Sequence, residues 1–168
     1  LTIDEPQNGS IEVRLEDSDE LLQNGDKIQE NAVVLIKPIS DENYKVSSLK
    51  INGYEQIGFL EDGIYKHQVT KDLRISVSFK RVHTLTMGKV ENGVIEVRIS
   101  ENGVLGELLG NDSKVEDGVV LSIKPVANDG YELHSLLLND NEIKDLLSDG
   151  VYLQTVKKNI VIDAEFSL

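Results

Sequence analysis

Apolar and polar residues alternate with a period of two along several short stretches of the chain. The two clearest stretches each place four apolar side chains at alternate positions: Leu73, Ile75, Val77 and Phe79 in one, and Ile160, Ile162, Ala164 and Phe166 in the other. A strand with one buried and one solvated face gives this alternation, as in an antiparallel sheet. We therefore predict two half-buried strands that direct these apolar side chains into a core.

Turn-forming residues separate these stretches from shorter alternations at residues 11–15 and 121–124. The pairs Asn8-Gly9, Asn52-Gly53 and Asn92-Gly93 suit turns with positive φ, which Asn and Gly adopt at little cost. Later in the chain, Asn139-Asp140-Asn141 replaces the second of these turns. The pattern predicts hairpins and a mainly β fold.

Prolines and the scarcity of helical periodicity support the same fold class. Pro38 and Pro125 are expected at strand ends, because proline has no N–H to donate to the ladder. Residues 142–147 have room for a single helical turn, which Asp149-Gly150 would end at once.

The sequence also repeats itself. Residues 8–14 return as residues 92–98 at an offset of 84, and residues 36–38 return as residues 123–125 at an offset of 87. From residue 33 to residue 79, 17 of the 47 positions aligned at the second offset are identical, which indicates a duplication. The matched pairs include Tyr44 with Tyr131, Leu49 with Leu136, Asn52 with Asn139, Tyr65 with Tyr152 and Phe79 with Phe166.

The duplication predicts two domains, residues 1–82 and 83–168, each small enough to fold alone with little margin. The change of offset falls before residue 33, where acidic and glycine residues at 16–26 and 101–118 predict a surface loop in each unit. We expect five or six strands per unit, in two tandem antiparallel β repeats. Residues 80–83 are a short connector without glycine or proline, so we expect an end-to-end arrangement and an elongated particle.

Composition and charge narrow the partners. The net charge of −13 disfavours nucleic acid and anionic lipid, since both carry negative charge. The chain has no run of about 18 apolar residues, so no membrane insertion is expected. It has no cysteine, which excludes thiolate metal sites, thiol nucleophiles and disulfides.

No residue is put forward as catalytic, cofactor-binding or metal-binding. The three histidines do not recur between the copies: His67 aligns with Gln154, His134 aligns with Ser47, and His83 lies in the connector. No nucleophile elbow, phosphate loop or dinucleotide fingerprint is present. Asp163 and Glu165 lie on the polar side of the last alternating stretch. We therefore expect no enzyme activity and no cofactor.

Two features leave narrower alternatives open. Residues 16–20 cluster oxygen-bearing side chains, and calcium needs six to eight oxygen ligands, but the spacing lacks the glycine and closing glutamate of a calcium loop. The matched tyrosines Tyr44, Tyr131, Tyr65 and Tyr152 suit partly buried packing with a wet hydroxyl, and stacking on a glycan is the alternative.

The order of features resembles the divergent B-repeat domains, related to internalin B repeats, of bacterial surface and secreted proteins. The second copy carries it in Asn92-Gly93, Ile123-Lys124-Pro125, Gly130-Tyr131-Glu132-Leu133, Leu138-Asn139, Tyr152, Val156 and Ala164-Glu165-Phe166. The first copy carries it in Asn8-Gly9, Ile36-Lys37-Pro38, Tyr44, Ile51-Asn52-Gly53, Tyr65, Val69 and Phe79. Where such repeats often have tryptophan, this chain has Leu49 and Leu136.

The resemblance implies a β-grasp-like or related small β fold, export to the cell surface or medium, and no catalytic residues. We expect a non-catalytic structural or adhesion module, a spacer or protein-interaction domain that is monomeric within a longer chain. Its partner would be a protein or glycan at the cell surface. The alternative is a carbohydrate- or calcium-binding accessory domain of a secreted enzyme, which an exposed aromatic pair on a concave face would favour.

Overall fold

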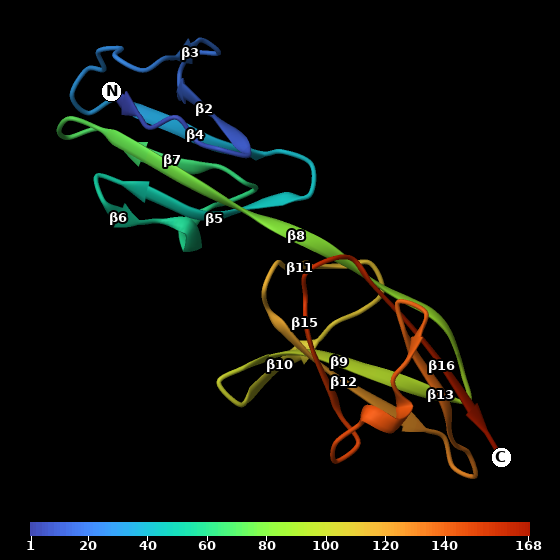
Figure 1. Cartoon of the computed structure of the whole chain (residues 1–168). Coiled ribbons are helices and arrows are strands. Elements are labelled where there is room, and N and C mark those ends of the chain that lie inside the picture. The colour runs from blue at the N-terminus through green and yellow to red at the C-terminus, as the bar shows by residue number, and fades with distance from the viewer. The chain divides into compact units, whose positions relative to one another are not determined.

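The computed structural model describes all residues, 1–168, and the chain is mainly β, as predicted (Figure 1). It divides into two compact units, Leu1–Arg81 (unit 1) and Val82–Leu168 (unit 2). The helical segments are two 3-10 turns of three residues each, so no helix is long and apolar enough to cross a membrane.

Unit 1 builds two sheets from short strands. Its elements are β1 (Thr2–Ile3), β2 (Gly9–Leu15), β3 (Leu21–Leu22), β4 (Val33–Ser40), β5 (Tyr44–Ile51), β6 (Tyr54–Glu55), the turn η1 (Ile57–Phe59), β7 (Tyr65–Gln68) and the first part of β8 (Arg74–Glu91). One sheet has the order β3-β2-β4-β7, and the other joins β1, β8, β5 and β6 in that order. Buried Val13, Ile36, Leu49 and Ile75 come from both sheets, so the core of unit 1 takes side chains from each.

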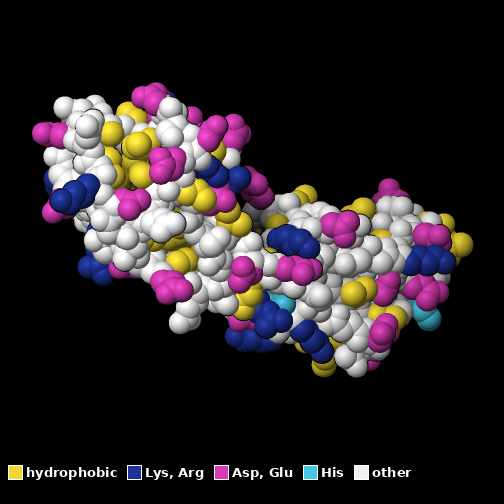
Figure 2. Space-filling view, turned by 90° about the horizontal axis from the view of Figure 1, so that it is seen from above, with side chains coloured by type: hydrophobic (Ala, Val, Ile, Leu, Met, Phe, Trp, Pro, Cys, Tyr) yellow, Lys and Arg dark blue, Asp and Glu magenta, His cyan; other side chains and the backbone are white.

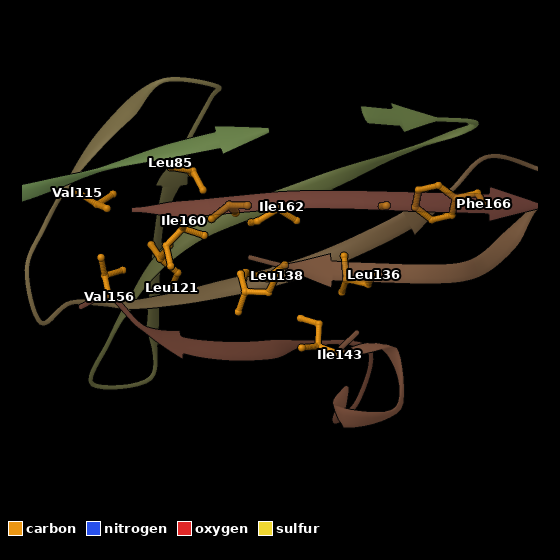
Figure 3. Packing of buried hydrophobic residues seen from close by; sticks show 13 residues of the cluster. Leu85, Val115, Leu121, Leu136, Leu138, Ile143, Val156, Ile160, Ile162 and Phe166 are labelled. Atoms are coloured by element: carbon orange, nitrogen blue, oxygen red, sulfur yellow. The ribbon is translucent and has the colours of Figure 1, made fainter. Parts of the chain in front are cut away.

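Unit 2 builds its sheets in the same way. Its elements are the rest of β8, β9 (Gly93–Glu101), β10 (Val104–Leu108), β11 (Ser113–Glu116), β12 (Val120–Ala127), β13 (Glu132–Leu138), β14 (Asn141–Glu142), the turn η2 (Lys144–Leu146), β15 (Tyr152–Thr155) and β16 (Ile160–Ser167). One sheet has the order β10-β9-β12-β15, and the other runs β14-β13-β16-β8, with β11 paired to β8. Figure 3 shows the buried core of this unit, in which Leu136, Ile162 and Phe166 lie among the labelled side chains.

The strand registers of the two units coincide once the two sequence offsets are applied. Thr2 of β1 pairs with Arg74 in parallel, and the equivalent Thr86 of β8 pairs with Val161 in parallel. Ile51 pairs with Tyr54 across the first tight hairpin, and Leu138 pairs with Asn141 across the second. The strand that opens each unit is therefore parallel to the strand that closes it.

The predicted connector is wrong. Residues 80–83 lie inside the continuous strand β8 and do not separate two strands. The backbone stays extended because a new partner begins where the old one ends: Arg81 pairs with Tyr44 of β5, and Val82 pairs with Glu116 of β11.

The predicted surface loop in unit 2 is also wrong in part. Residues 101–118 contain β10, which folds back on β9 through a turn at Asn102 (φ 52°) and Gly103 (φ 78°), and they contain β11 as well. These additions and the two-residue strands explain why the units have more strands than the five or six predicted. Side-chain alternation cannot reveal β10, because all five of its residues are exposed.

The predicted turns are present, but at the Asn92-Gly93 turn glycine is required for a different reason than predicted. Asn52 and Gly53 both have positive φ, as do Asn139 and Asp140. At the first turn of unit 2, however, only Asn92 has positive φ (66°). Gly93 is needed for space, because a Cβ there would lie 2.6 Å from Cε2 of Phe166, and Gly9 meets Phe79 in the same way.

Two further predictions need correction. Pro38 and Pro125 do not end their strands, which run on to Ser40 and Ala127. Pro38 instead lies where β4 has lost one neighbour, since pairing with β7 stops at Ile36, and a missing N–H is tolerated there. The inward assignment of both closing strands is correct, but Phe79 is only partly buried whereas Phe166 is 4% exposed.

Candidate functional site

The three histidines lie in three different settings. His83 is 5% exposed in β8, and its Nε2 lies 2.8 Å from Oδ1 of Asp117, the residue after β11. The second carboxylate oxygen of Asp117 lies 3.7 Å from Nζ of Lys157. The imidazole therefore ties β8 to the loop that follows β11. Sequence reasoning missed this pair because the two residues are 34 positions apart.

The other two histidines come together with neither His83 nor each other. His67 of β7 stacks on Tyr65 with ring centroids 6.1 Å apart, and burial lowers the pKa of its imidazole. His134 lies exposed on β13. The structure therefore brings together none of the histidines that the sequence singles out.

A matched pair of glutamates, missed by the sequence analysis, binds backbone in both units. Glu142 accepts hydrogen bonds from the Ser135 hydroxyl (2.5 Å) and from the N–H groups of Leu136 (2.8 Å) and Lys144 (3.1 Å). Glu55 accepts the equivalent bonds from Ser48 and from the N–H of Leu49 (2.8 Å). The hydroxyl is the main cause that lowers the pKa of each carboxyl, with backbone N–H groups adding to it.

These carboxylates fasten the 3-10 turn to the strand before it. Each spans the hairpin and the first residues after it, where backbone N–H groups lack a ladder partner. The available signal was the identity of Ser48 with Ser135 and of Glu55 with Glu142 in the repeat alignment. A serine and a glutamate seven residues apart that recur in both copies would therefore have predicted this hydrogen bond.

Matched asparagines fasten the same hairpin to the closing strand. The side-chain oxygen of Asn52 accepts the N–H of Arg74 at 2.7 Å, while its own N–H donates to the Arg74 carbonyl at 2.9 Å. Asn139 does the same with Val161, at 2.7 and 2.8 Å. Asparagine suits this position because it tolerates positive φ and carries an acceptor on a short side chain.

A third carboxylate occupies a similar place in both units but comes from the residue after β1 in unit 1 and from β16 in unit 2. In unit 1, Asp4 accepts hydrogen bonds from Arg74 (3.0 and 3.1 Å) and from Ser76, and Arg74 is the main cause that lowers its pKa. In unit 2 the position equivalent to Asp4 is Gly88, and a Cβ there would collide with the carboxylate of Asp163. Asp163 aligns with Ser76, and its Oδ1 accepts the N–H of Lys89 at 2.9 Å.

The acidic stretch at residues 16–20 does not gather its oxygens around a common centre. Glu16 lies 2.7 Å from Nζ of Lys66, and the Ser18 hydroxyl accepts the N–H of Glu20 at 3.1 Å. Arg14 donates to the carbonyl of Asp19. No group of three or more His, Cys, Asp or Glu side chains is placed to hold a metal ion. Figure 2 shows acidic side chains spread over the visible surface among basic ones.

Three of the four repeated tyrosines belong to the packing, whereas two other aromatic residues are exposed. Tyr65, Tyr131 and Tyr152 pack against the cores as partly buried residues. Tyr54 is 71% exposed and Phe59 is 69% exposed, and Phe59 borders a hollow of about 440 Å³ with Glu61 and Lys66. These two exposed aromatic residues were not predicted from the sequence, because neither recurs in the other copy.

Unit 2 has exposed apolar residues of its own on β10. Val104, Leu105 and Leu108 are 69%, 55% and 56% exposed on a strand that pairs on one side only, with β9. Unit 1 has only the two-residue β3 at the corresponding edge.

Comparison with known proteins identifies no family for this chain. No protein-family model matches the chain, and no curated protein matches it either. Interpretation therefore depends on the geometry of the two units.

Proposed function

We propose that the chain is a non-catalytic module of a cell-surface or secreted protein, acting as a spacer or protein-interaction domain. This is the role implied by the resemblance to internalin-type B-repeats. The partner would be a protein at the cell surface. The observation that carries the proposal is that repeated polar side chains bind the protein's own backbone.

Two pairs of polar side chains that are identical in both copies serve the backbone. Asn52 and Asn139 bind the closing strand, and Glu55 and Glu142 bind the 3-10 turn. A duplicated binding or catalytic site would be expected to retain polar groups directed at a ligand. The copies instead share polar residues that stabilise the fold. This suits a repeat that acts as a spacer or presents a surface to a partner.

The accessory-domain alternative is favoured by one observation, the exposure of two aromatic side chains, Tyr54 and Phe59. Aromatic rings exposed beside polar groups can stack on sugar rings. The equivalent positions in unit 2 are Asn141 and Leu146, so any such site would belong to unit 1 alone.

Thermal unfolding in the presence of candidate ligands separates the two roles. A ligand at 100 times its dissociation constant would stabilise the protein by about 2.7 kcal/mol, which a thermal scan detects. We expect calcium, chelator and a panel of oligosaccharides to leave the melting temperature unchanged. Stabilisation by an oligosaccharide that Phe59→Ala abolishes and the matched control Leu146→Ala retains would replace the proposal with the accessory role.

A further inference from the structure

One edge of the sheet β10-β9-β12-β15 in unit 2 is an open strand. β10 pairs with β9 only, and all five of its residues are exposed (Figure 1). Exposed strand edges pair readily with other strands, and many proteins keep them short or charged for that reason. Unit 1 has the two-residue strand β3 at the corresponding edge, whereas unit 2 has a longer strand with three exposed apolar side chains.

The turn of the hairpin fixes which backbone groups of β10 face away from β9. Asn102 and Gly103 form a two-residue turn, with φ of 52° and 78°. In such a hairpin the flanking residues, Glu101 and Val104, exchange hydrogen bonds with each other. Because hydrogen-bonded and non-hydrogen-bonded pairs alternate along the ladder, the next residue, Leu105, directs its N–H and carbonyl to the open side.

A bulge between Leu105 and Leu108 gives Leu108 the same orientation. The residue after it, Leu109, donates its N–H to a carbonyl of β9 at 2.8 Å, so Leu108 directs its own N–H and carbonyl to the open side. On β9 the partners of the two leucines, Ser100 and Arg98, are two positions apart. A regular strand can therefore bond to both leucines with two alternate residues.

The side chains of the same two leucines lie on the outer face of the sheet. Arg98 follows Val97, whose side chain is fully buried in the core, so Arg98 and its partner Leu108 belong to the outer face. Leu105 and Leu108 are 55% and 56% exposed there. An apolar side chain on an added strand would bury part of this surface.

Unit 1 has charges on this face where unit 2 has none. Leu153 of β15 lies in the same row of the register as Leu108 and is 59% exposed. Its counterpart Lys66 lies 2.7 Å from Glu16, which aligns with Ser100 at the offset of 84. Unit 2 therefore has neither charge of this ion pair, and its outer face is the more apolar of the two.

Acidic side chains determine the charge that suits the edge. Glu101 and Glu107 are exposed in the hairpin, while Arg98 donates to the Gly106 carbonyl at 2.9 Å. Glu107 opposes Ile99, which packs against the core, so Glu107 lies on the face opposite to the two leucines. An added strand would place alternate side chains beside the leucines and the one between them beside Glu107. The pattern that fits is apolar, basic, apolar.

We propose that β10 is an acceptor edge for an extended segment of another protein with this apolar–basic–apolar pattern. Two of its residues would exchange main-chain hydrogen bonds with Leu105 and Leu108. Strand addition is an established mode of peptide recognition, in which main-chain bonds supply affinity and side chains supply selectivity. A second copy of this chain is a poor occupant, because it would bring its own Glu107 and a net charge of −13 to the same edge.

The inference rests on the proposed interaction role, because it names a class of partner for it. The two can fail separately. Absence of strand binding at β10 would remove this site and leave the spacer role standing. Stabilisation by an oligosaccharide that depends on Phe59 would replace the proposed role without affecting strand pairing at β10.

The test uses the full chain and the synthetic peptide acetyl-Thr-Lys-Val-Lys-Val-Lys-Thr-amide, which has the pattern and no charged ends. Titration into isotopically labelled protein should shift the amide signals of Leu105 and Leu108. At saturation, amide exchange at both residues should slow by at least about tenfold, because their N–H groups become bonded. The amides of Leu21 and Leu22 at the short edge of unit 1 are the internal control. Equal shifts there would show adhesion without a defined site and would overturn the proposal.

Methylated peptides test the main-chain bonds. A methyl group on the backbone nitrogen of either valine should weaken binding by about tenfold or more, since these nitrogens would donate to β10. A methyl group on the backbone nitrogen of the central lysine is the matched control. It should leave the affinity unchanged, because that nitrogen would point away from β10.

Variants of the protein test the same contacts from the other side. Glu107→Gln should weaken binding, while the matched control Glu132→Gln, an exposed acid elsewhere on unit 2, should not. Leu108→Pro removes an N–H that β9 does not use, so it should abolish binding and leave the fold of unit 2 intact. Equal binding of the valine-methylated and lysine-methylated peptides, or no binding at all, would overturn the proposal. Self-association of the chain that Leu108→Pro abolishes would also overturn it, because the edge would then belong to a second copy.

Discussion

Unit 1 and unit 2 keep the same strand register but hold it with partly different residues. The matched asparagines and glutamates bind the same backbone groups in both units. The third carboxylate comes from Asp4 beside β1 in unit 1 and from Asp163 of β16 in unit 2. The comparison teaches that a contact can be retained in space while its residue moves to the neighbouring strand.

The units diverge most at their edges. Unit 2 adds the hairpin strand β10, while unit 1 has only the two-residue strand β3 at the corresponding edge. Edges tolerate such change because few core contacts depend on them. Edges are also where an added strand can bind, so divergence there has consequences for recognition.

The largest difference between the units is expected from the closing phenylalanines. Phe166→Ala removes a side chain that is 4% exposed and should destabilise unit 2 by about 3–5 kcal/mol, enough to unfold a domain of this size. Phe79→Ala should cost less, because Phe79 is only partly buried. Chemical denaturation of each variant measures both effects. An equal loss in the two variants would show that the burial difference has no energetic meaning.

The glycines beneath these rings give the next effect. Gly93→Ala places a methyl group 2.6 Å from the Phe166 ring and 2.7 Å from the Val126 carbonyl, so we expect a loss of about 1–3 kcal/mol from overpacking. The double variant Gly93→Ala/Phe166→Ala should lose less than the sum of the single losses, since the ring that clashes is gone. Strict additivity in denaturant titrations would contradict the proposed packing of ring on glycine.

The hairpin asparagines should have smaller and similar effects. Asn139→Ala removes the acceptor of the Val161 N–H and puts alanine at a φ of 48°, which together should cost about 1–2 kcal/mol. Asn52→Ala should cost the same in unit 1, where φ is 51°. Lys158→Ala, at an exposed position of unit 2, is the control. A large effect in one unit only would mean that the shared asparagine has different roles.

The smallest effect concerns pH. Because the folded-state pKa of Glu142 is lowered, its carboxylate contributes stability above about pH 4.5, and this contribution is lost as the pH falls through the folded-state pKa. Glu142→Gln should therefore flatten the acid side of the stability curve, and Glu55→Gln should do the same for unit 1. Stability measured from pH 7 down to pH 3 checks this. An unchanged acid slope would show that these hydrogen bonds do not persist in solution.

The sequence was sufficient for the parts of the fold that depend on periodicity and turn chemistry. Alternation located the strands that contain Ile75 and Ile162, and the turn residues Asn52-Gly53 and Asn139-Asp140 located the two matched tight hairpins. Both signals depend only on residues that are close in the sequence: turn residues adopt positive φ for local steric reasons, and alternation reflects the burial of one face of a strand.

The remainder depends on which strands come together. Nothing local in residues 80–83 distinguishes a connector from the middle of a strand, because their conformation follows from partners at Tyr44 and Glu116. The bond between His83 and Asp117 joins residues 34 positions apart, and the Asp163 contact makes sense only once Gly88 lies beside it.

The central claim is that both units pair their opening and closing strands in one register, whichever residues support it. Interstrand nuclear Overhauser effects in the full chain test this most directly. The account predicts contacts between the backbones of Thr2 and Arg74 and, equivalently, of Thr86 and Val161. Contacts displaced by one residue in either unit would turn its apolar side chains to the other face of the sheet and would contradict the claim.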